Sequence, residues 1–459
     1  MTISRRHLLR YAASASALAA TGAIPATLTR AFAAEEEKRT IPWKNWSGGQ
    51  SATPEIRLAP ASEAELSEIV KTSVTPIRAV GAGHSFSPLV PTQGTLLSLD
   101  RLNGLIGHDP ERQRATLRAG TRLGAMGDLL AAKNLALANM PDINKQTIAG
   151  AISTATHGTG ADIGSLSAMR LTTASGDALD CDETSNPDLL SAARVSLGAL
   201  GIVTQTTLQA RALYKLKRRT WTAPVEEMLE QAPELWASHR NFEFYYVPYS
   251  GMTIAITNDE TDEPETPEPV NEDDDGLRQL QQLQEWLGWS PAARRWVIQK
   301  ILGATEPETR IDYSHKTLST ERNVRFNEME YHLPREEAIT ALREIIDAIE
   351  TNNVEVFFPI EFRTTAPDDA WLSPFYKRES CSIAVHRFHE EDYKPYFSLI
   401  EPIHRKHDGR PHWGKLNTLA AADFAALYPK WKDFLEVRAE LDPEGKFLNP
   451  YLKKVFGIA

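Results

Sequence analysis

The sequence predicts a two-domain α+β protein, and three observations lead to this prediction. The chain has 459 residues, which is more than one hydrophobic core usually serves. Residues 56–210 alternate short helical and strand patterns with glycine-rich turns, which is typical of a mixed α/β unit. Near Leu213 the pattern changes to longer helices mixed with alternating strands, which indicates an α+β second domain.

The elements of the first unit follow from local spacing. A helix is predicted over 62–72, because the segment opens with Ser and Glu and then repeats apolar residues three and four positions apart. Short apolar runs predict strands over 77–80, 96–99 and 115–119. Helical periodicity returns over 123–133.

The second unit contains longer elements and one unusual segment. Residues 258–275 form an acidic run interrupted by proline, which we interpret as a solvated surface loop. The run lacks the fixed glycine of an EF-hand, so a calcium loop is not expected. Helices are predicted over 220–239, 276–302 and 334–350, and strands over 242–247, 323–331, 353–363 and 380–388.

Charge and cysteine usage exclude several classes of protein. The net charge of -11 offers no basic field for phosphates, so we expect no nucleic-acid partner. Cys181 and Cys381 are the only cysteines, and their spacing excludes a cysteine zinc site. No metal site is expected. Whether the two thiols pair is left open by the sequence.

Residues 1–34 are predicted to be an export signal. Paired arginines at Arg5 and Arg6 precede an Ala-rich apolar stretch and a small-residue cleavage site, which resembles a bacterial twin-arginine signal. An ordinary secretory signal is the alternative. We therefore expect the export machinery as a partner and a periplasmic or secreted protein of net charge about -15 after cleavage. Elsewhere no apolar run is long enough to span a bilayer.

A glycine-rich loop follows the strand over 77–80. Its sequence runs from Gly81 to Ser87 as Gly-Ala-Gly-His-Ser-Phe-Ser. Such a loop lets backbone N–H groups face a pyrophosphate. Phe86 stands where the dinucleotide fingerprint has its third glycine, and no acidic residue follows at the expected distance, so a NAD site is not favoured.

Two further segments consist mostly of small residues, whereas a hydrophobic core is built from large apolar side chains. Residues 146–160 are mostly Gly, Ala, Ser and Thr, and residues 196–204 again combine small residues with a strand-like exit. Small side chains allow an extended ligand to lie against the backbone, with hydroxyl and N–H groups as donors.

Together these segments resemble the FAD-binding domain of the vanillyl-alcohol oxidase / p-cresol methylhydroxylase flavoproteins, and most of all their aldonolactone oxidase and alditol oxidase branch. The resemblance runs from about Trp43 to the C-terminus. It implies an FAD-binding α/β domain over 35–212, a substrate (cap) domain over 213–410, and a segment over 411–459 that returns to the FAD site. The FAD contacts that it implies are Gly81, Ala82, Gly83, His84, Ser85, Phe86, Asp142, Thr147, Gly150, Thr154, Ala155, Thr156, His157 and Ile202.

The resemblance also implies that His84 is bonded covalently to the flavin. A neutral imidazole nitrogen is a competent nucleophile toward an oxidised flavin. A flavin held without that bond is the alternative. Pro141-Asp142 departs from the small residue and serine of many relatives. In the wider family a Gly or Pro at this position goes with oxygen-reactive members, so the resemblance implies an oxidase rather than a dehydrogenase.

Three residues are predicted to act on the substrate. Glu361 and Arg363 alternate on a strand and so share one face, where a carboxylate and a guanidinium suit a polyhydroxylated ligand. Spacing alone would favour a surface ion pair, but the family has the same Glu-x-Arg in its substrate pocket. Lys415, in the motif His-Trp-Gly-Lys, is implied to lie beside the flavin. We interpret His386 as a packed structural histidine.

The resemblance implies oxidation of a sugar-derived alcohol or aldono-1,4-lactone, with hydride transfer to FAD. Dioxygen is the expected acceptor and hydrogen peroxide the product, and Glu361 is the candidate for taking the substrate proton. The alternatives are an alditol (polyol) oxidase, a dehydrogenase of the same fold with a periplasmic acceptor, and a flavin- or carbohydrate-binding protein without turnover.

Overall fold

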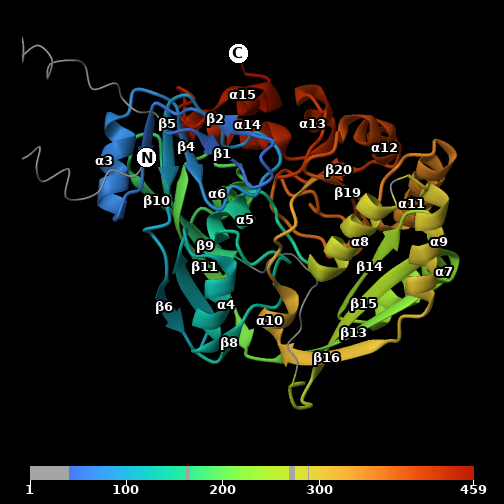
Figure 1. The fold of residues 1–459 in the computed structure, drawn as a ribbon. Helices are drawn as coiled ribbons and strands as arrows, with labels where there is room; N and C mark the ends of the chain where they lie inside the picture. Colours follow the sequence, from blue (N-terminus) through green and yellow to red (C-terminus); the bar gives the residue numbers. More distant parts are fainter. Residues whose placement is uncertain (1–40, 161–165, 268–273, 288, 459) are drawn as a thin grey trace, which may run out of the picture. The chain divides into compact units, whose positions relative to one another are not determined.

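The computed structural model of the protein describes residues 41–160, 166–267, 274–287 and 289–458. The chain divides into Met1–Ile41 and Pro42–Ala459, and the architecture below is that of the second unit (Figure 1). The predicted export signal lies outside the described residues. No helix among the described residues is both long and apolar enough to cross a membrane.

Two main sheets build the N-terminal part. A parallel sheet has the order β3–β5–β4, with β3 at Ile56–Leu58, β5 at Thr95–Ser98 and β4 at Ile77–Val80. The second sheet is antiparallel in the order β10–β9–β11–β7–β6. Its strands are β6 (Leu105–Asp109), β7 (Arg114–Arg118), β9 (Leu166–Thr172), β10 (Ala178–Asp182) and β11 (Ile202–Gln209).

An antiparallel eight-stranded sheet dominates the rest, in the order β16–β13–β15–β14–β18–β19–β17–β20. Its strands are β13 (Lys215–Pro224), β14 (Asn241–Val247), β15 (Met252–Thr261), β16 (Glu308–Tyr313), β17 (Phe326–Pro334), β18 (Ile360–Thr365), β19 (Ser380–Phe388) and β20 (Arg410–Pro411). Two short ribbons, β1–β2 (Trp43–Lys44, Ser51–Ala52) and β8–β12 (Leu135–Ala136, Arg211–Ala212), complete the strands.

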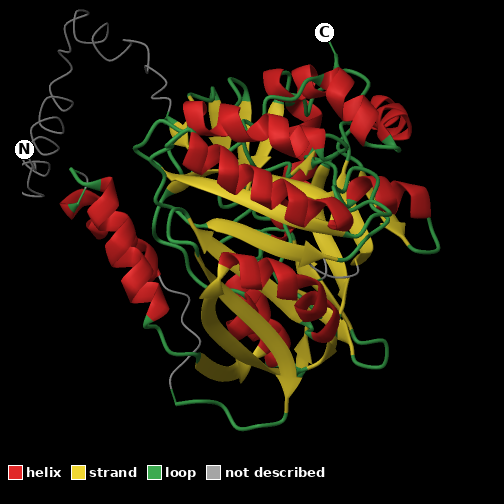
Figure 2. Ribbon diagram, turned by 90° about the vertical axis from the view of Figure 1, so that its right-hand side faces the viewer, coloured by secondary structure: helices red, strands yellow, loops and turns green. Residues whose placement is uncertain are grey.

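Helices lie against these sheets (Figure 2). Those of the N-terminal part are α3 (Glu63–Thr72), α4 (Leu123–Ala131), α5 (Ile148–Ser153) and α6 (Pro187–Ala193). Those of the second part are α7 (Val225–Ser238), α8 (Asp274–Trp286), α9 (Pro291–Gly303), α10 (Ser314–Leu318), α11 (Arg335–Thr351) and α12 (Lys394–Lys406). The chain ends with α13 (Ala421–Leu427), α14 (Trp431–Leu441) and α15 (Pro450–Phe456).

The two faces of the eight-stranded sheet are covered differently. On β14, Tyr246 points toward α11, where its hydroxyl donates to Glu350 (2.6 Å). Its neighbour Val247 points to the opposite face and packs with Leu280 of α8 and Ile298 of α9. Successive strand residues alternate between faces, so the face with α8 and α9 also carries Glu361 and Arg363.

The chain end returns to the N-terminal strands, as the resemblance implied. The N–H of Ile77 donates to the carbonyl oxygen of Lys446 (2.8 Å). Asn449, which caps α15, donates to the carbonyl oxygens of Pro88 and Pro91 (2.9 Å each). Figure 1 accordingly shows α14 and α15 beside the blue N-terminal strands.

Several predicted elements were wrong in their bounds. Residues 220–224 are strand rather than helix, because β13 pairs with β15 throughout and the helix begins only after Pro224. The helix predicted over 276–302 is two helices, interrupted before Pro291. The strand predicted over 353–363 begins only at Ile360. The acidic loop does not start at 258, because β15 continues to Thr261, and residues 268–273 lie outside the described part.

Cys181 and Cys381 are free thiols in different sheets, on β10 and β19, and both are buried. Burial raises the pKa of Cys181 to about 11 and that of Cys381 to about 12. Both therefore behave as small apolar side chains rather than as reactive thiolates.

Candidate active site

One cavity of about 720 Å³ lies between the N-terminal segments and the eight-stranded sheet. Its volume falls within the range of roughly 300–1,000 Å³ that small-molecule and cofactor sites occupy. The glycine-rich loop, the small-residue segment around α5 and the start of β11 line one side. Glu361, Arg363 and Lys415 line the other side.

The glycine-rich loop lines this cavity, and several of its N–H groups have no protein acceptor in the described part of the chain. Within the described residues, the backbone N–H groups of Ala82, Gly83, His84 and Ser85 donate to no protein acceptor. The next N–H, that of Phe86, is fixed by the carbonyl oxygen of Gly414 (2.7 Å). Polar N–H groups rarely stay unpaired at such a site, so this arc fits a phosphate-bearing ligand.

Gly81 is required by packing rather than by the ligand. A Cβ atom built on it would lie 2.0 Å from Thr147 Oγ1, so no side chain fits between the loop and α5. Gly83 has φ +68, in the left-handed region that favours glycine. The loop therefore needs its two glycines for two different reasons.

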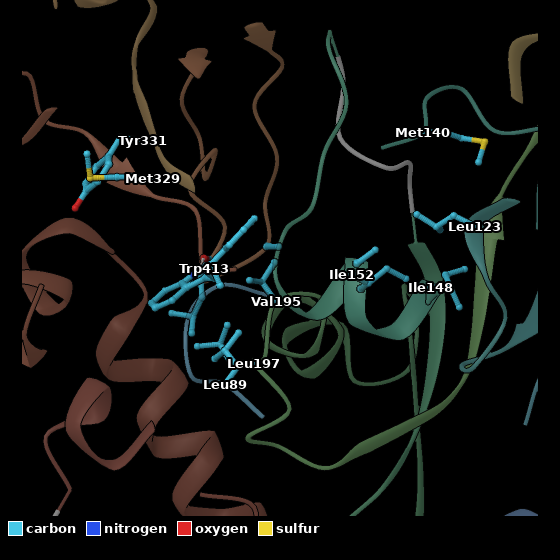
Figure 3. Packing of buried hydrophobic residues seen from close by; sticks show 14 of the residues in the cluster. Leu89, Leu123, Met140, Ile148, Ile152, Val195, Leu197, Met329, Tyr331 and Trp413 are labelled. Atoms are coloured by element: carbon cyan, nitrogen blue, oxygen red, sulfur yellow. Dashed lines mark hydrogen bonds between the residues drawn. The ribbon is translucent and has the colours of Figure 1, made fainter. Parts of the chain in front are cut away.

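Helix α5 divides its residues between core and cavity. Ile148 and Ile152 are buried in the hydrophobic core (Figure 3), whereas Ala149, Gly150 and Ser153 line the cavity. Further along the core, Figure 3 shows Leu89, Leu197 and Trp413. The small residues make room along the cavity wall while the large ones hold the helix in place.

The cavity fits the FAD that the resemblance implies. Gln146 lines it, and the Oε1 atom of this amide is buried without a partner. A buried carbonyl oxygen without a donor is costly, so a ligand N–H or hydroxyl is expected there. With the N–H arc and the small-residue wall, the residues present suit a dinucleotide.

Arg363 lies at the centre of an ionic network. Its Nη1 donates to Asp142 Oδ2 (2.5 Å) and its Nη2 to Glu330 Oε1 (2.6 Å), while Nε lies 3.5 Å from Glu361 Oε1. Burial opposes the charge, but the carboxylates of Glu361, Glu330 and Asp142 raise the pKa of Arg363 well above its ordinary value. Tyr245 completes the group, because its hydroxyl donates to Glu361 Oε1 (2.8 Å).

Lys415 is held by a second carboxylate of β17. Its ammonium donates to Glu328 Oε2, and the other oxygen of Glu328 lies 3.4 Å from His386 Nε2. Burial alone would raise the pKa of Glu328, but Lys415 and His386 lower it to about 2. Glu328 and Glu330 are two positions apart on β17, so they share a face and each fixes one cation.

His84 lines the cavity on the side of the glycine-rich loop. Its ring stacks on Trp46, with centroids 4.9 Å apart. Burial, followed by the charges of Lys415 and Arg122, lowers the pKa of His84 to about 4. The imidazole is therefore neutral at physiological pH, which leaves a ring nitrogen lone pair available.

Comparison with known proteins agrees with this architecture. The family model described as FAD binding domain matches residues 54–182, and the one described as D-arabinono-1,4-lactone oxidase matches residues 206–455, more than half of the chain. The chain belongs to the D-arabinono-1,4-lactone oxidase family. Its N-terminal part is an FAD-binding domain.

Related proteins can be aligned with this chain over nearly its whole length. The L-gulono-1,4-lactone dehydrogenase of Mycobacterium tuberculosis is 37% identical over 90% of this chain and 99% of its own. The L-gulonolactone oxidase of Bos taurus is 31% identical, over 91% and 98%. A solvent-stable cholesterol oxidase, 18% identical, shares the fold with a TM-score of 0.74, over 91% and 97%.

The structure brings nearly all of the predicted site residues of this family member to one cavity. Ala155 is the exception: it is absent from the cavity wall, and its positive φ of 53 turns the chain between Thr154 and Thr156, which do line it. Asp142 lines the cavity, but its side chain binds Arg363 and its carbonyl oxygen accepts from Thr320 N–H (2.8 Å). The other predicted residues line the cavity.

His386 also lines the cavity, so it is more than the packed structural histidine that the sequence indicated. Its Nδ1 lies 3.1 Å from the carbonyl oxygen of Pro359, and its Nε2 faces Glu328. A carboxylate oxygen of Glu328, a carboxylate oxygen of Glu361 and a ring nitrogen of His386 lie within 4.8 Å of one another. A polar substrate group entering here would meet all three.

Sequence reasoning missed Glu328, Glu330, Tyr245 and Arg78. The first three lie on strands whose alternation was visible, but nothing local showed which face meets the cavity. Arg78 lies in a short apolar strand and looked like a strand residue. Its buried guanidinium donates to the carbonyl oxygens of Leu89, Leu197, Gly198 and Phe447, which joins three chain segments at the cavity wall.

Proposed function

We propose that the protein is an FAD-dependent oxidoreductase that oxidises a CH–OH group of a sugar-derived lactone or alcohol. The observation that carries the proposal is the single cavity in which the FAD-type segments face Glu361, Arg363 and Lys415. When bound, FAD supplies the hydride-accepting chemistry that no side chain provides. Two relatives named for gulonolactone support the lactone class.

The side chains have complementary tasks in this proposal. Glu361 accepts hydrogen bonds from substrate hydroxyls, and the hydroxyl of Tyr245 holds it in place. Arg363 and Lys415 stabilise the negative charge that grows on the substrate oxygen as its proton leaves. Glu361 takes that proton, and His386 lies close enough to pass it on.

Burial of these groups supports the same proposal. Glu361 and Arg363 are 7% and 4% exposed, so little water competes for the substrate oxygens. Charges interact more strongly where water is excluded. A surface ion pair, which the local spacing alone suggested for Glu361 and Arg363, would be far more exposed.

The test is a substrate panel on the purified holoenzyme. Aldonolactones and alditols are added anaerobically, and loss of the visible flavin band is followed. We expect an aldonolactone to bleach the band, and faster bleaching by alditols would favour the polyol alternative. No bleaching by any member of the panel would reject an oxidoreductase and favour a binding protein without turnover.

For the acceptor we propose dioxygen, with hydrogen peroxide as the product. Pro141 in the cavity wall and the name of the Bos taurus relative support an oxidase. The name of the Mycobacterium tuberculosis relative favours the second candidate, a dehydrogenase. Stopped-flow mixing of the reduced enzyme with air and with a redox dye separates them: slow reaction with air and fast reaction with dye would reject the oxidase.

We further propose that FAD is attached through His84. The neutral imidazole at the cavity wall supports this attachment. In His84→Ala, acid precipitation should release the flavin into the supernatant, whereas the exposed control His108→Ala should keep it in the precipitate. Flavin that stays with precipitated His84→Ala would disprove the assignment.

Export through the twin-arginine route is proposed from residues 1–34. Arg5→Lys combined with Arg6→Lys should leave the protein uncleaved in the cytoplasm, because paired arginines are what that signal presents. Normal export of the double variant would indicate the ordinary secretory alternative.

A further inference from the structure

The face of the sheet that lines the cavity changes character from one end to the other. One row of cross-strand partners runs Glu330, Ala384, Glu361, Tyr245 and Ile254, from β17 to β15. Partners in a row share a face, so the row is charged at one end and apolar at the other. Tyr245 stands at the boundary, with its hydroxyl on Glu361.

Beyond Tyr245 the cavity continues between α8, α9 and the sheet. We call this part the apolar wing, and define it by Val247, Leu280, Leu283 and Ile298, which all line the cavity. The polar side chains that line it, Gln279 and Gln282, are exposed on α8. An apolar wall of this kind favours binding of an apolar group and offers no hydrogen bond to a hydroxyl group.

Two apolar side chains on α8 and α9 line the cavity and are exposed to solvent as well. Trp286 and Ile301 both line the cavity, yet they are 72% and 53% exposed. Exposed apolar side chains that also line a cavity leave apolar surface that a ligand can cover. The nearby Trp289 is 80% exposed and Trp296 62%, and neither lines the cavity.

A sugar lactone or polyol has no apolar part that would fill the wing. Dioxygen, the acceptor proposed above, is too small to fill the wing, so the wing is available to a further and larger electron acceptor. We propose that the apolar wing binds an uncharged acceptor of the quinone class, which gives the protein a quinone-reducing activity beside the reaction proposed above and rests on that reaction.

The overall reaction balances with the two substrates alone. The CH–OH group becomes C=O and gives up two electrons and two protons. The two carbonyl oxygens of the quinone take up these electrons and protons and become the two hydroxyl groups of the quinol. The protein retains no net charge or proton after one cycle.

The position of the wing predicts where the quinone ring lies. With its apolar tail between α8 and the sheet, the ring reaches past Tyr245 to the pocket of Arg363 and Lys415. The Lys415 ammonium has three N–H donors, and Glu328 is the acceptor that the structure gives it, so donors remain for a quinone carbonyl. Substrate and quinone would then occupy the same polar pocket in turn, which predicts ping-pong kinetics with competition by excess substrate.

The test compares two quinones on the oxidised holoenzyme without substrate. A benzoquinone with a decyl tail should bind at least about tenfold more tightly than the same ring without the tail, measured by calorimetry, because the tail buries apolar surface in the wing. Trp286→Gln combined with Ile301→Gln should remove most of this difference. The matched control, Trp289→Gln combined with Trp296→Gln, should keep it.

All four substituted residues are exposed, so the variants should fold as the parent does. Equal affinity for the two quinones, or an equal loss in both double variants, would overturn the proposal. The anaerobic bleaching by lactones is measured separately. Bleaching without a tail effect would overturn the quinone site and leave the proposed oxidation standing. Tail-dependent binding without bleaching would overturn the proposed oxidation, and the quinone-reducing activity with it, but not quinone binding in the wing.

Discussion

Arg363 Nη2 donates to Glu330 Oε1 over 2.6 Å, and both side chains are buried. Glu330 lies on β17, and Glu328 of the same strand accepts a hydrogen bond from Lys415. Burial alone would raise the pKa of Glu330, but Arg363 and His157 keep it well below its ordinary range. Both carboxylates are therefore charged partners that fix the direction of the cations, and they act on the substrate only through them.

Glu330→Gln keeps the shape of the side chain and removes its charge. We expect kcat to fall by roughly 10- to 100-fold with a smaller change in KM, because a cation displaced by about 1 Å costs rate more than binding. Steady-state kinetics with the best substrate of the panel measures this. The control Glu226→Gln loses an exposed ion pair to Arg343 and should change kcat less than about twofold.

Lys415→Met should reduce kcat by about 100-fold or more, because it removes a charge aimed at the developing oxyanion. Glu328→Gln should reduce kcat by less than Lys415→Met does, because the ammonium group of Lys415 remains but is no longer held in position. The order of the two effects is measured by single-turnover bleaching of the flavin. A larger loss in Glu328→Gln than in Lys415→Met would show that Glu328 itself contacts the reacting atoms.

Gly81→Ala should be destabilising by about 1–3 kcal/mol, because the new Cβ atom would overlap Thr147. Thr147→Ala removes the Oγ1 atom that lies 2.0 Å from that Cβ, and leaves its own Cβ at 3.1 Å. The double variant should therefore be more stable than the sum of the single changes predicts. Urea unfolding of the four proteins measures the coupling, and strict additivity would contradict the close approach.

The pH dependence of flavin attachment tests the environment of His84. Its pKa is lowered from 6.5 to about 4, so the neutral ring is retained as the pH falls through 6.5 and is lost only near 4. Apoprotein mixed with FAD should form acid-stable flavin at a constant rate down to about pH 5, with a half-maximal rate near the lowered pKa of His84. A half-maximal rate near 6.5 would mean that His84 is not desolvated.

The sequence predicted the cofactor side of the site better than the substrate side. His84 and Thr147 stand in short segments of mostly small residues, and the segments taken together, with the family resemblance, indicated a ligand. Glu328 and Glu330 belong to a strand that the pattern did predict. Their partners Lys415 and Arg363 are distant in sequence, and no local signal pairs a strand carboxylate with a remote cation.

Element bounds failed where tertiary pairing overrides local preference. Residues 220–224 carry a helical pattern, yet β15 pairs with all of them, and the helix is delayed until after Pro224. The apolar wing could not be predicted from the sequence for a similar reason. Leu280 and Ile298 have ordinary helical spacing, and only the packing of α8 and α9 against β14 and β15 leaves space beside them.

The central claim is that one cavity holds FAD against a Glu361–Arg363–Lys415 pocket that oxidises a sugar-derived CH–OH group. Anaerobic titration of the purified protein with an aldonolactone measures it most directly. We predict a yellow protein whose visible band is lost in proportion to added lactone, and whose Arg363→Met variant keeps the band when lactone is added. A colourless protein that gains no band from added FAD, or a band that no lactone or alditol bleaches, would contradict the claim.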